Sequence, residues 1–296
     1  NAFVVQKNII KSLVDVHTLA DDKSQILNVI NQFKPDIIHF QEIPQFDLAP
    51  FILDQIFTKD RNYFIIASTH GSFTNPSEIV YHPDRYVLVS EWSRQKFEET
   101  GVETMLWEYP IEEYKFDKKA AQKELGFESD WKHILNVGLW TKGKNQGELL
   151  EIAKKYPEMM FHSVGNQAGN FTDYWQPLMK DVPSNVKIWG ERADVELFMT
   201  AADVFMFNST WECNPLVLRE AMAHTLPIVA RNLPQYGDMF TKYLDPIDTD
   251  LRTITRKYKT SNDKNSRAFA LKHERAYKEL MKVPIRKQQV SITRPR

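Results

Sequence analysis

Short apolar runs alternate with segments of helical periodicity along most of the chain. In residues 25–33, apolar side chains recur at intervals of three and four, which places them on one face of a helix. Pro35 ends this helix, and residues 36–40 then form an apolar run typical of a buried strand. Because helices and such strands alternate, the pattern predicts an α/β fold with parallel sheets.

The same alternation predicts elements in both halves of the chain. Further strands are expected at residues 15–19, 63–68, 85–89, 133–137, 159–164, 186–189, 204–208 and 227–230. Further helices are expected at residues 5–13, 93–100, 117–125, 146–155, 195–201 and 215–223, and a long charged helix at residues 263–281. A polar, proline-bearing stretch at residues 108–114 interrupts the alternation, which then begins again.

We therefore expect two Rossmann-like domains that face one another across a cleft. The expected N-terminal domain covers residues 1–115, the second domain residues 116–262, and a basic helix and tail residues 263–296. Ligands of open α/β sheets bind beyond the carboxyl ends of the strands, so the polar residues at those ends are the natural site candidates.

Composition narrows the class of protein. Cys213 is the single cysteine, which excludes a disulfide scaffold and a zinc site built from cysteines and favours a reducing compartment. No run approaches the roughly 20 apolar residues that span a bilayer. Asn1 is not followed by a signal-peptide pattern, and Gly71 is the only glycine in the first hundred residues. We expect a cytoplasmic protein in which either the true N-terminus is missing or the first strand and turn are degenerate.

Charge is distributed unevenly. Residues 251–296 hold 14 Lys or Arg and three acids, a net charge of +11, so the preceding 250 residues carry −12 of the total of −1. A basic end of this kind is typical of a solvated helix face and terminus, and the alternative is peripheral contact with an anionic membrane. Nucleic acid is not expected as a partner, because neither stacking aromatic residues nor a nucleic-acid motif accompanies the charge.

The strongest chemical signal is the segment 209–223. Pro215 suits the first position of a helix, where an amide would have no partner. The free amides of Leu216 and Val217, together with the positive end of the helix dipole, would then form an anion site suited to a diphosphate.

Two glutamates flank this helix start. Glu212 lies in the loop before it and Glu220 lies eight residues later, so the two carboxylates can follow one extended ligand. Carboxylates accept hydrogen bonds from paired hydroxyls, as sugars and ribose offer. Each glutamate taken alone is more typical of a surface acid or an intrahelical ion pair.

This segment resembles the Glu-x7-Glu signature of retaining glycosyltransferases of the GT-B fold, the group 1 or family 4-like enzymes. The resemblance extends over residues 133–240. It implies that Glu212 approaches hydroxyls of the donor sugar and that Glu220 holds the ribose of a nucleoside diphosphate. It also places Asn214, Leu216 and Val217 among the donor-binding residues.

A second element leads from a predicted strand into a basic loop. Gly138 allows a close backbone turn, and Lys144 offers a positive charge to phosphate oxygens. The resembled family has Arg directly after this glycine, where the sequence has Leu139, and Lys142 is the cation that could compensate. The loop is one residue short of a P-loop, whose Ser or Thr is replaced by Asn145, so an NTPase is disfavoured.

Other candidates lie at strand ends of the expected N-terminal domain. His70 follows a strand, and the resemblance implies that it lines the acceptor side of the cleft as a catalytic residue; a lone histidine is otherwise typical of a structural cap. His39, Glu42 and Trp92 lie at neighbouring strand ends and either shape the acceptor pocket or serve the fold. Gly190 matches the glycine that the family places near the nucleobase.

These observations predict an enzyme that moves a sugar from a nucleoside diphosphate donor to a carbohydrate, lipid-linked or protein acceptor, with retention of configuration. The resemblance implies the retention. No cofactor and no metal are expected, since no histidine cluster or acidic pair has ligand spacing. The alternatives are an epimerase or hydrolase of the same fold and a non-catalytic nucleotide- or carbohydrate-binding protein.

Overall fold

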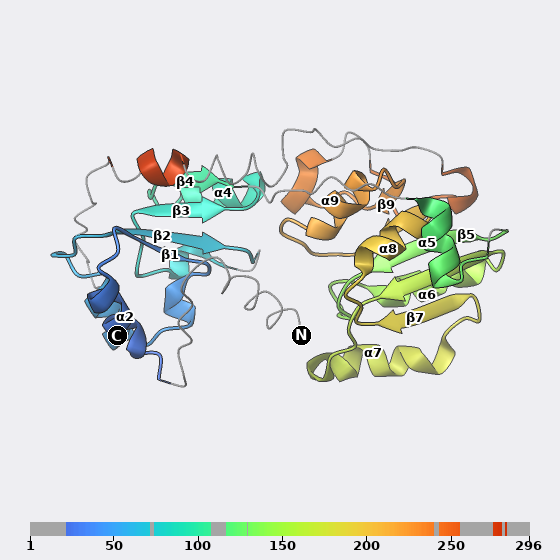
Figure 1. Ribbon diagram of the computed structural model, residues 1–296, viewed down its shortest axis with the longest axis horizontal. Coiled ribbons are helices and arrows are strands. Elements are labelled where there is room, and N and C mark those ends of the chain that lie inside the picture. Colours follow the sequence, from blue (N-terminus) through green and yellow to red (C-terminus); the bar gives the residue numbers. More distant parts are fainter. Residues whose placement is uncertain are drawn as a thin grey trace.

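Two separate parallel β-sheets organise the chain in the computed structural model (Figure 1). The structure describes residues 22–71, 74–107, 117–128, 130–239, 243–254, 275–279 and 282. The first sheet has four strands in the order β1-β2-β3-β4, and the second has five in the order β7-β6-β5-β8-β9. All the paired strands of both sheets run parallel, which confirms the predicted α/β fold.

The first sheet and its helices come from the N-terminal half. Its strands are β1 (Ile37–Phe40), β2 (Phe64–Thr69), β3 (Arg85–Leu88) and β4 (Thr104–Leu106). Its helices are α2 (Gln25–Phe33), α3 (Pro50–Ile56) and α4 (Glu91–Glu98), with short 3₁₀ turns η1 (Pro44–Phe46) and η2 (Pro76–Glu78). Helix α2 and strands β1 to β3 lie where the pattern predicts them, whereas α3 and β4 were not predicted.

Both faces of the first sheet are covered. Along β2, Ile65 faces a cluster formed by α2 and α3, while the neighbouring Ile66 faces the opposite side. That opposite side is covered by Trp107 and by Ala276 and Tyr277, which belong to a helical turn at the C-terminal end of the chain. The red turn beside β4 in Figure 1 is this segment, so the chain returns to the first sheet after completing the second.

The second sheet and its helices follow in the C-terminal half. Its strands are β5 (Lys132–Val137), β6 (Met159–Val164), β7 (Val186–Gly190), β8 (Val204–Phe207) and β9 (Ile228–Ala230). Its helices are α5 (Lys118–Leu125), α6 (Gln146–Lys155), α7 (Thr172–Leu178), α8 (Val195–Ala201) and α9 (Leu216–Ala223). Short 3₁₀ turns are η3 (Gly169–Phe171), η4 (Met179–Asp181), η5 (Pro234–Met239) and η6 (Leu251–Thr253).

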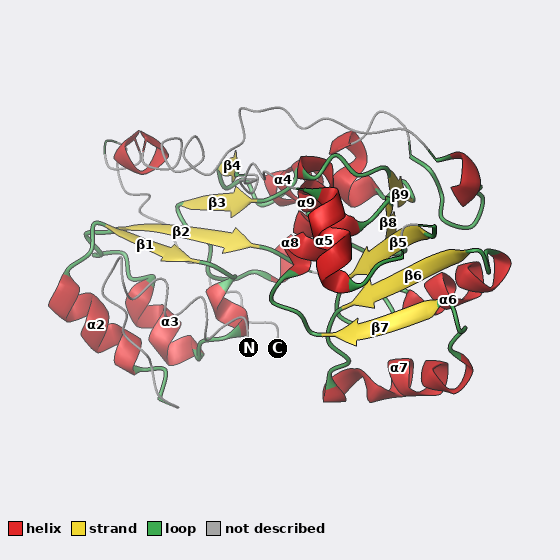
Figure 2. Ribbon diagram, turned by 45° about the vertical axis from the view of Figure 1, so that its right-hand side comes forward, coloured by secondary structure: helices red, strands yellow, loops and turns green. Residues whose placement is uncertain are grey.

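The second sheet is buried on both faces, as parallel sheets require. In β8, Phe205 packs in one cluster with α5, α8 and α9, whereas Met206 packs in the other with α6. Figure 2 shows α5 and α8 side by side over the sheet, with α7 next to β7. Among the described residues, helices therefore cover both faces of this sheet.

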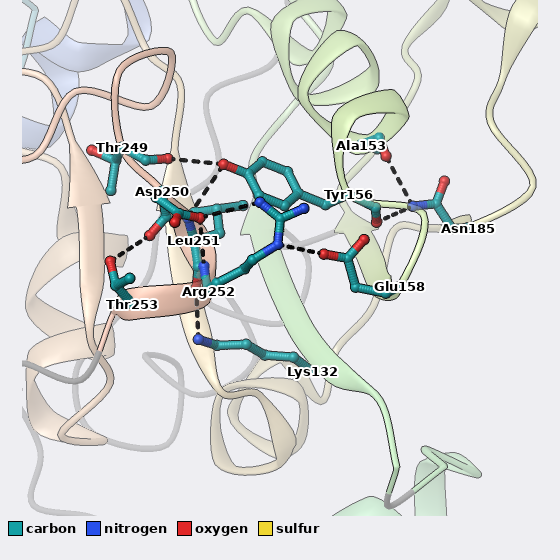
Figure 3. A network of polar contacts seen from close by, with 10 residues as sticks. All are labelled: Lys132, Ala153, Tyr156, Glu158, Asn185, Thr249, Asp250, Leu251, Arg252 and Thr253. Atoms are coloured by element: carbon teal, nitrogen blue, oxygen red, sulfur yellow. Dashed lines mark hydrogen bonds and ion pairs between the residues drawn. The ribbon is translucent and has the colours of Figure 1, made fainter.

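The edge where the second sheet begins is fastened by the chain that leaves it (Figure 3). The Tyr156 hydroxyl donates to the Thr249 carbonyl at 3.3 Å and accepts from the Leu251 amide at 3.4 Å. The Lys132 ammonium donates to the Leu251 carbonyl at 2.6 Å, and the Arg252 guanidinium lies over the Tyr156 ring. This network lies at the start of β5, away from the edge where the strands end.

Several boundaries differ from the predicted ones for local reasons. Helix α4 begins earlier than residue 93 because the Ser90 hydroxyl accepts from the Ser93 amide and caps it. Pro215 precedes α9 as its cap and is not its first residue. The elements predicted at residues 5–13 and 15–19, most of the helix at residues 263–281, and most of the expected domain junction lie outside the described residues. The predicted domain boundaries therefore stay predictions.

Candidate functional site

The loop between β8 and α9 joins the two halves of the molecule. The Cys213 thiol lies 3.3 Å from the Ser93 hydroxyl at the start of α4. The Asn214 amide nitrogen donates to the carbonyl of Val89, which directly follows β3. The loop that carries Glu212 therefore rests on the ending edge of the first sheet, which is the edge formed by the carboxyl ends of its strands. This contact brings the site candidates of both halves toward one another.

Lys144 and Glu212 form an ion pair at the ending edge of the second sheet. Their side chains are 29% and 10% exposed, so water screens this pair less than a surface pair. The stem of Lys144 packs over Gly138, where an added Cβ would lie 3.6 Å from a Lys144 carbon. A stricter requirement lies at Gly165, which was not predicted: a Cβ there would lie 1.9 Å from the Gly138 carbonyl oxygen.

Helix α9 begins at the predicted place with its first amides unbonded by the helix. The first helical hydrogen bond runs from the Leu218 amide to the Pro215 carbonyl at 3.2 Å. The amides of Leu216 and Val217 precede it, so the helix offers them no acceptor. An anion at this end would receive two amide hydrogens and the positive end of the helix dipole.

Glu220 lies half-buried in α9. Burial raises the pKa of its carboxyl above the ordinary glutamate range. Among the described residues, no side chain or amide hydrogen-bonds to this carboxylate, although its own main-chain carbonyl is paired with His224 Nδ1 at 2.9 Å. A half-buried carboxylate that has no partner within the described part of the protein can accept hydrogen bonds from ligand hydroxyls.

Two other predicted donor-binding residues serve the fold, one through its hydrogen bonds and the other through its backbone conformation. The Asn214 carboxamide also accepts from Arg219 Nε at 3.0 Å, so both of its ends are engaged. Gly190 has φ +68°, a conformation that side chains rarely adopt, and among the described residues other than its chain neighbours no atom lies within 4 Å of where its Cβ would be. The backbone itself therefore calls for glycine at this position. The donor contacts of both residues stay predictions.

On the first sheet, Glu42 and His70 meet at the ending edge. The Thr69 hydroxyl donates to the Glu42 carboxylate at 3.2 Å, and the His70 amide donates to it at 3.3 Å. Glu42 is exposed and His70 is half-buried. The backbone of His70 thus helps to orient a carboxylate at the predicted acceptor side, while the catalytic role of its imidazole stays a prediction.

The contacts of His39 favour a role in the fold over a role in the acceptor pocket. Its ring lies 2.7 Å from the Ser68 hydroxyl and 2.6 Å from the Tyr277 hydroxyl, and Trp107 meets it edge-on. These partners belong to the face covered by the C-terminal helical turn. His39 therefore fastens that turn to the first sheet.

Charged groups from the ending edges of both sheets act on the Cys213 thiol. Burial raises the pKa of the Cys213 thiol; hydrogen bonds from Ser93 and Ser90 oppose this, and the charges of Glu212 and Glu42 add to it. Carboxylates from both halves therefore lie near one buried thiol. This shared neighbourhood is what a ligand bound between the two edges would meet.

A buried network supports the loop from behind and was not predicted. The Arg231 guanidinium pairs with Glu148 at 2.7 Å and donates to the Asn208 carbonyl at 2.6 Å. The Asn208 amide in turn donates to Glu148 at 2.9 Å. These residues come from three separate elements and fix the point where the loop leaves β8. The only local signal was an acidic residue in the first turn of α6, which alone is uninformative.

Within the described residues, no group of three or more histidines, cysteines or carboxylates is placed to hold a metal ion. No described helix is long and apolar enough to cross a membrane. The expectation that the protein works without a metal stays a prediction.

Two parallel Rossmann-like sheets with polar residues at both ending edges define the GT-B fold. Solved structures of this fold are similar to the chain. Sucrose-phosphate synthase from Thermosynechococcus elongatus matches with a TM-score of 0.69 at 16% identity, over 87% of this chain and 76% of that one. HepE from Anabaena in complex with UDP matches with a TM-score of 0.65 at 15% identity, over 94% of this chain and 81% of that one.

Sequence comparison then points to a particular family. The family model "Glycosyl transferases group 1" matches residues 117–245, which contain the second sheet, Lys144 and both glutamates of the loop and α9. A processive diacylglycerol alpha-glucosyltransferase from Acholeplasma laidlawii is 24% identical over 203 residues, 62% of this chain and 60% of that protein. An uncharacterized glycosyltransferase from Haemophilus influenzae is 35% identical over 107 residues, 34% of this chain and 30% of that protein. The chain thus spans about 60% of the first of these relatives and less of the second.

Proposed function

We propose that the protein is a glycosyltransferase that moves a sugar from a nucleoside diphosphate donor to an acceptor hydroxyl with retention of configuration. The observation that carries this proposal is the arrangement at α9: two open amides at the helix start, the Lys144–Glu212 pair before it, and the unsatisfied Glu220 carboxylate within it. The match of residues 117–245 to a glycosyltransferase family supports it.

Each group has a defined task in this reaction. Negative charge develops on the diphosphate as the sugar leaves, and Lys144 with the amides of Leu216 and Val217 stabilises it. Glu220 accepts hydrogen bonds from the ribose, and Glu212 orients the donor sugar. The reaction is a displacement on the face that the leaving group vacates, so no residue is assigned as nucleophile.

UDP-sugars are the first donors to test, because similar structures include HepE with UDP and with UDP-glucose. We would measure release of nucleoside diphosphate from UDP-, GDP- and ADP-sugars, with and without acceptor extracts. We would then determine the anomeric configuration of the product by NMR. Transfer with an inverted product would overturn the retaining mechanism and leave the transferase standing.

A non-catalytic binding protein is the second candidate, and Leu139 favours it. The resembled family has an Arg at this position, whereas Leu139 is an apolar side chain, 37% exposed, beside the Lys144 loop. Tight binding of a nucleotide without turnover of any donor, in every acceptor extract, would establish this second function. Turnover of donor in water alone would instead indicate a hydrolase or epimerase.

A further inference from the structure

We infer that Trp92, Trp211 and Glu42 form an acceptor subsite that binds a neutral sugar ring, so that the acceptor is a carbohydrate. The inference rests on the proposed transferase function and names the substrate class of the same site. Its evidence is a pair of indole rings, of which Trp211 is exposed, that crosses from one half of the molecule to the other, together with an exposed carboxylate linked to it by a chain of contacts.

The aromatic part of this surface joins the two halves. Trp92 lies in the first turn of α4, and Trp211 lies in the loop directly before Glu212. Their rings meet at right angles with centroids 6.4 Å apart. Trp211 is 40% exposed although it belongs to an otherwise largely buried loop. An exposed indole beside the residue expected to orient the donor sugar lies where an acceptor has to approach.

The polar part follows from Trp92 through a chain of contacts. The Lys96 ammonium lies 5.4 Å from the centre of the Trp92 ring and donates to the Thr74 carbonyl at 2.8 Å. The hydroxyls of Thr74 and Thr69 are 3.3 Å apart, and Thr69 donates to Glu42. A chain of contacts, which passes through the fully buried Thr69, therefore links the indole rings to an oriented carboxylate.

This combination selects a sugar ring among the possible acceptors. The C–H face of a pyranose packs on an indole, whose face is electron-rich, while its hydroxyls need acceptors at the rim. The Glu42 carboxylate has about four lone-pair sites and uses two of them on Thr69 and His70. A lipid chain would instead have to desolvate this exposed carboxylate.

The charges nearby also disfavour an anionic acceptor. Lys96 is committed to Thr74 and the Trp92 ring, and Lys144 is assigned to the diphosphate of the donor. Two carboxylates, Glu42 and Glu212, remain close to the surface and would repel a phosphate group. A neutral, hydroxyl-rich ring suits these surroundings.

Direct binding tests the inference without requiring turnover. We would record saturation-transfer NMR spectra of methyl glucoside, galactoside and mannoside with the full chain in the presence of UDP. We expect transfer to the ring protons of at least one glycoside. Trp92→Ala should abolish it, Glu42→Gln should weaken binding about tenfold, and Trp92→Phe should retain part of it.

Phe51→Ala is the matched control, because Phe51 is also an exposed aromatic residue, 58% accessible, but lies on α3 away from this surface. This control should bind the glycoside as the parent protein does. No transfer to any glycoside, or an undiminished signal in Trp92→Ala, overturns the inference. So does sugar transfer to diacylglycerol or to a hydroxyl-bearing peptide with a KM that Trp92→Ala leaves unchanged.

The proposed function fails separately, by a different measurement. If calorimetry detects no binding of UDP, GDP or ADP and no donor is consumed, the transferase is overturned, whereas glycoside binding that depends on Trp92 would still support a carbohydrate site.

Discussion

An aspartate stands directly before one strand of each sheet, Asp84 before β3 and Asp203 before β8. The Asp84 amide donates to the Ile65 carbonyl at 2.9 Å, and its carboxylate accepts from the Ile65 amide at 2.7 Å. Asp203 makes the same two bonds to His133, both at 2.8 Å. The two halves therefore join neighbouring strands by the same pair of hydrogen bonds, at the edge where the strands begin.

The cations that complete these contacts differ in burial. Arg61 pairs with Asp84 at 2.8 Å, and their side chains are 5% and 1% exposed. Lys118 pairs with Asp203 with side chains 42% and 28% exposed. The aspartate therefore belongs to a buried ion pair in the first half and to an ion pair that water screens in the second half.

The two ending edges differ in their charged groups. The first sheet ends in an exposed carboxylate, Glu42, held by two donors, and the second ends in the Lys144–Glu212 pair with Glu220 unsatisfied nearby. Charges at the beginning edges are satisfied within the protein, whereas Glu220 at the ending edge is not. The comparison separates groups that hold the fold from groups that await a ligand.

The largest expected effect is on stability. Asp84→Ala leaves the Arg61 charge buried without its partner and should lower the free energy of unfolding by about 3–5 kcal/mol. Asp203→Ala removes a more exposed pair and should lower it by about 1–2 kcal/mol. Urea unfolding followed by circular dichroism measures both. Equal losses in the two variants would show that burial of the cation does not set the difference.

The next effect is on catalysis. Lys144→Ala removes the cation expected to stabilise the diphosphate and should lower kcat about 100-fold. Its control is Lys154→Ala, since Lys154 lies on α6 in exposed ion pairs with Glu151 and Asp181. Steady-state release of nucleoside diphosphate compares the two variants. A loss of less than threefold in Lys144→Ala would move the leaving-group role elsewhere, with Lys142 the first residue to test.

Replacing Glu220 should weaken nucleotide binding but increase the stability of the protein. Glu220→Gln should weaken nucleotide binding about tenfold, because the ribose hydroxyls lose a charged acceptor. Because the parent carboxylate is half-buried and unsatisfied, the variant should also be about 1 kcal/mol more stable at pH 7. Calorimetric titration with UDP and urea unfolding measure the two quantities. A variant that binds normally, or that loses stability, would make Glu220 a structural residue.

The pH dependence of that stability difference has a defined sign. Burial raises the pKa of Glu220 in the folded protein above its unfolded value, so the folded state holds this proton more tightly. Its contribution to the free energy of unfolding is therefore full at low pH and is lost as pH rises through the raised pKa. The parent protein and Glu220→Gln should converge in stability below about pH 4, near the ordinary glutamate pKa. A gap that persists there would have another origin.

Strong local patterns made most of the fold predictable. Helices α2, α6 and α8 have the predicted bounds, because each has a clear apolar face and a distinct start or end. Helix α3 was missed, although Pro50 at its first position was a usable signal. Strand β4 has three residues at a sheet edge, where no continuous apolar run is needed.

The site was predictable where its residues are close in sequence. Glu212 and Glu220 could be predicted together because one loop and the helix that follows it carry both, and their roles stay predictions. The Glu148–Arg231 pair joins residues 83 apart, and Gly165 is needed because the Gly138 carbonyl lies within contact distance and because φ at Gly165 is +153°. Such requirements arise from the packing of strands against one another, which no local pattern records.

The smallest expected effect concerns the contact between the two ending edges. Asn214→Ala removes the hydrogen bonds to the Val89 carbonyl and from Arg219, and it should lower the free energy of unfolding by only about 1 kcal/mol. If the loop must rest on the first sheet for the acceptor to meet the donor, the variant should raise the acceptor KM about threefold while the affinity for UDP stays within twofold. Asn75→Ala is the control, since the Asn75 side chain accepts a local hydrogen bond from the Ser77 amide and caps η2. A matching loss of UDP affinity in Asn214→Ala would instead place Asn214 directly against the donor, as the sequence motif implies.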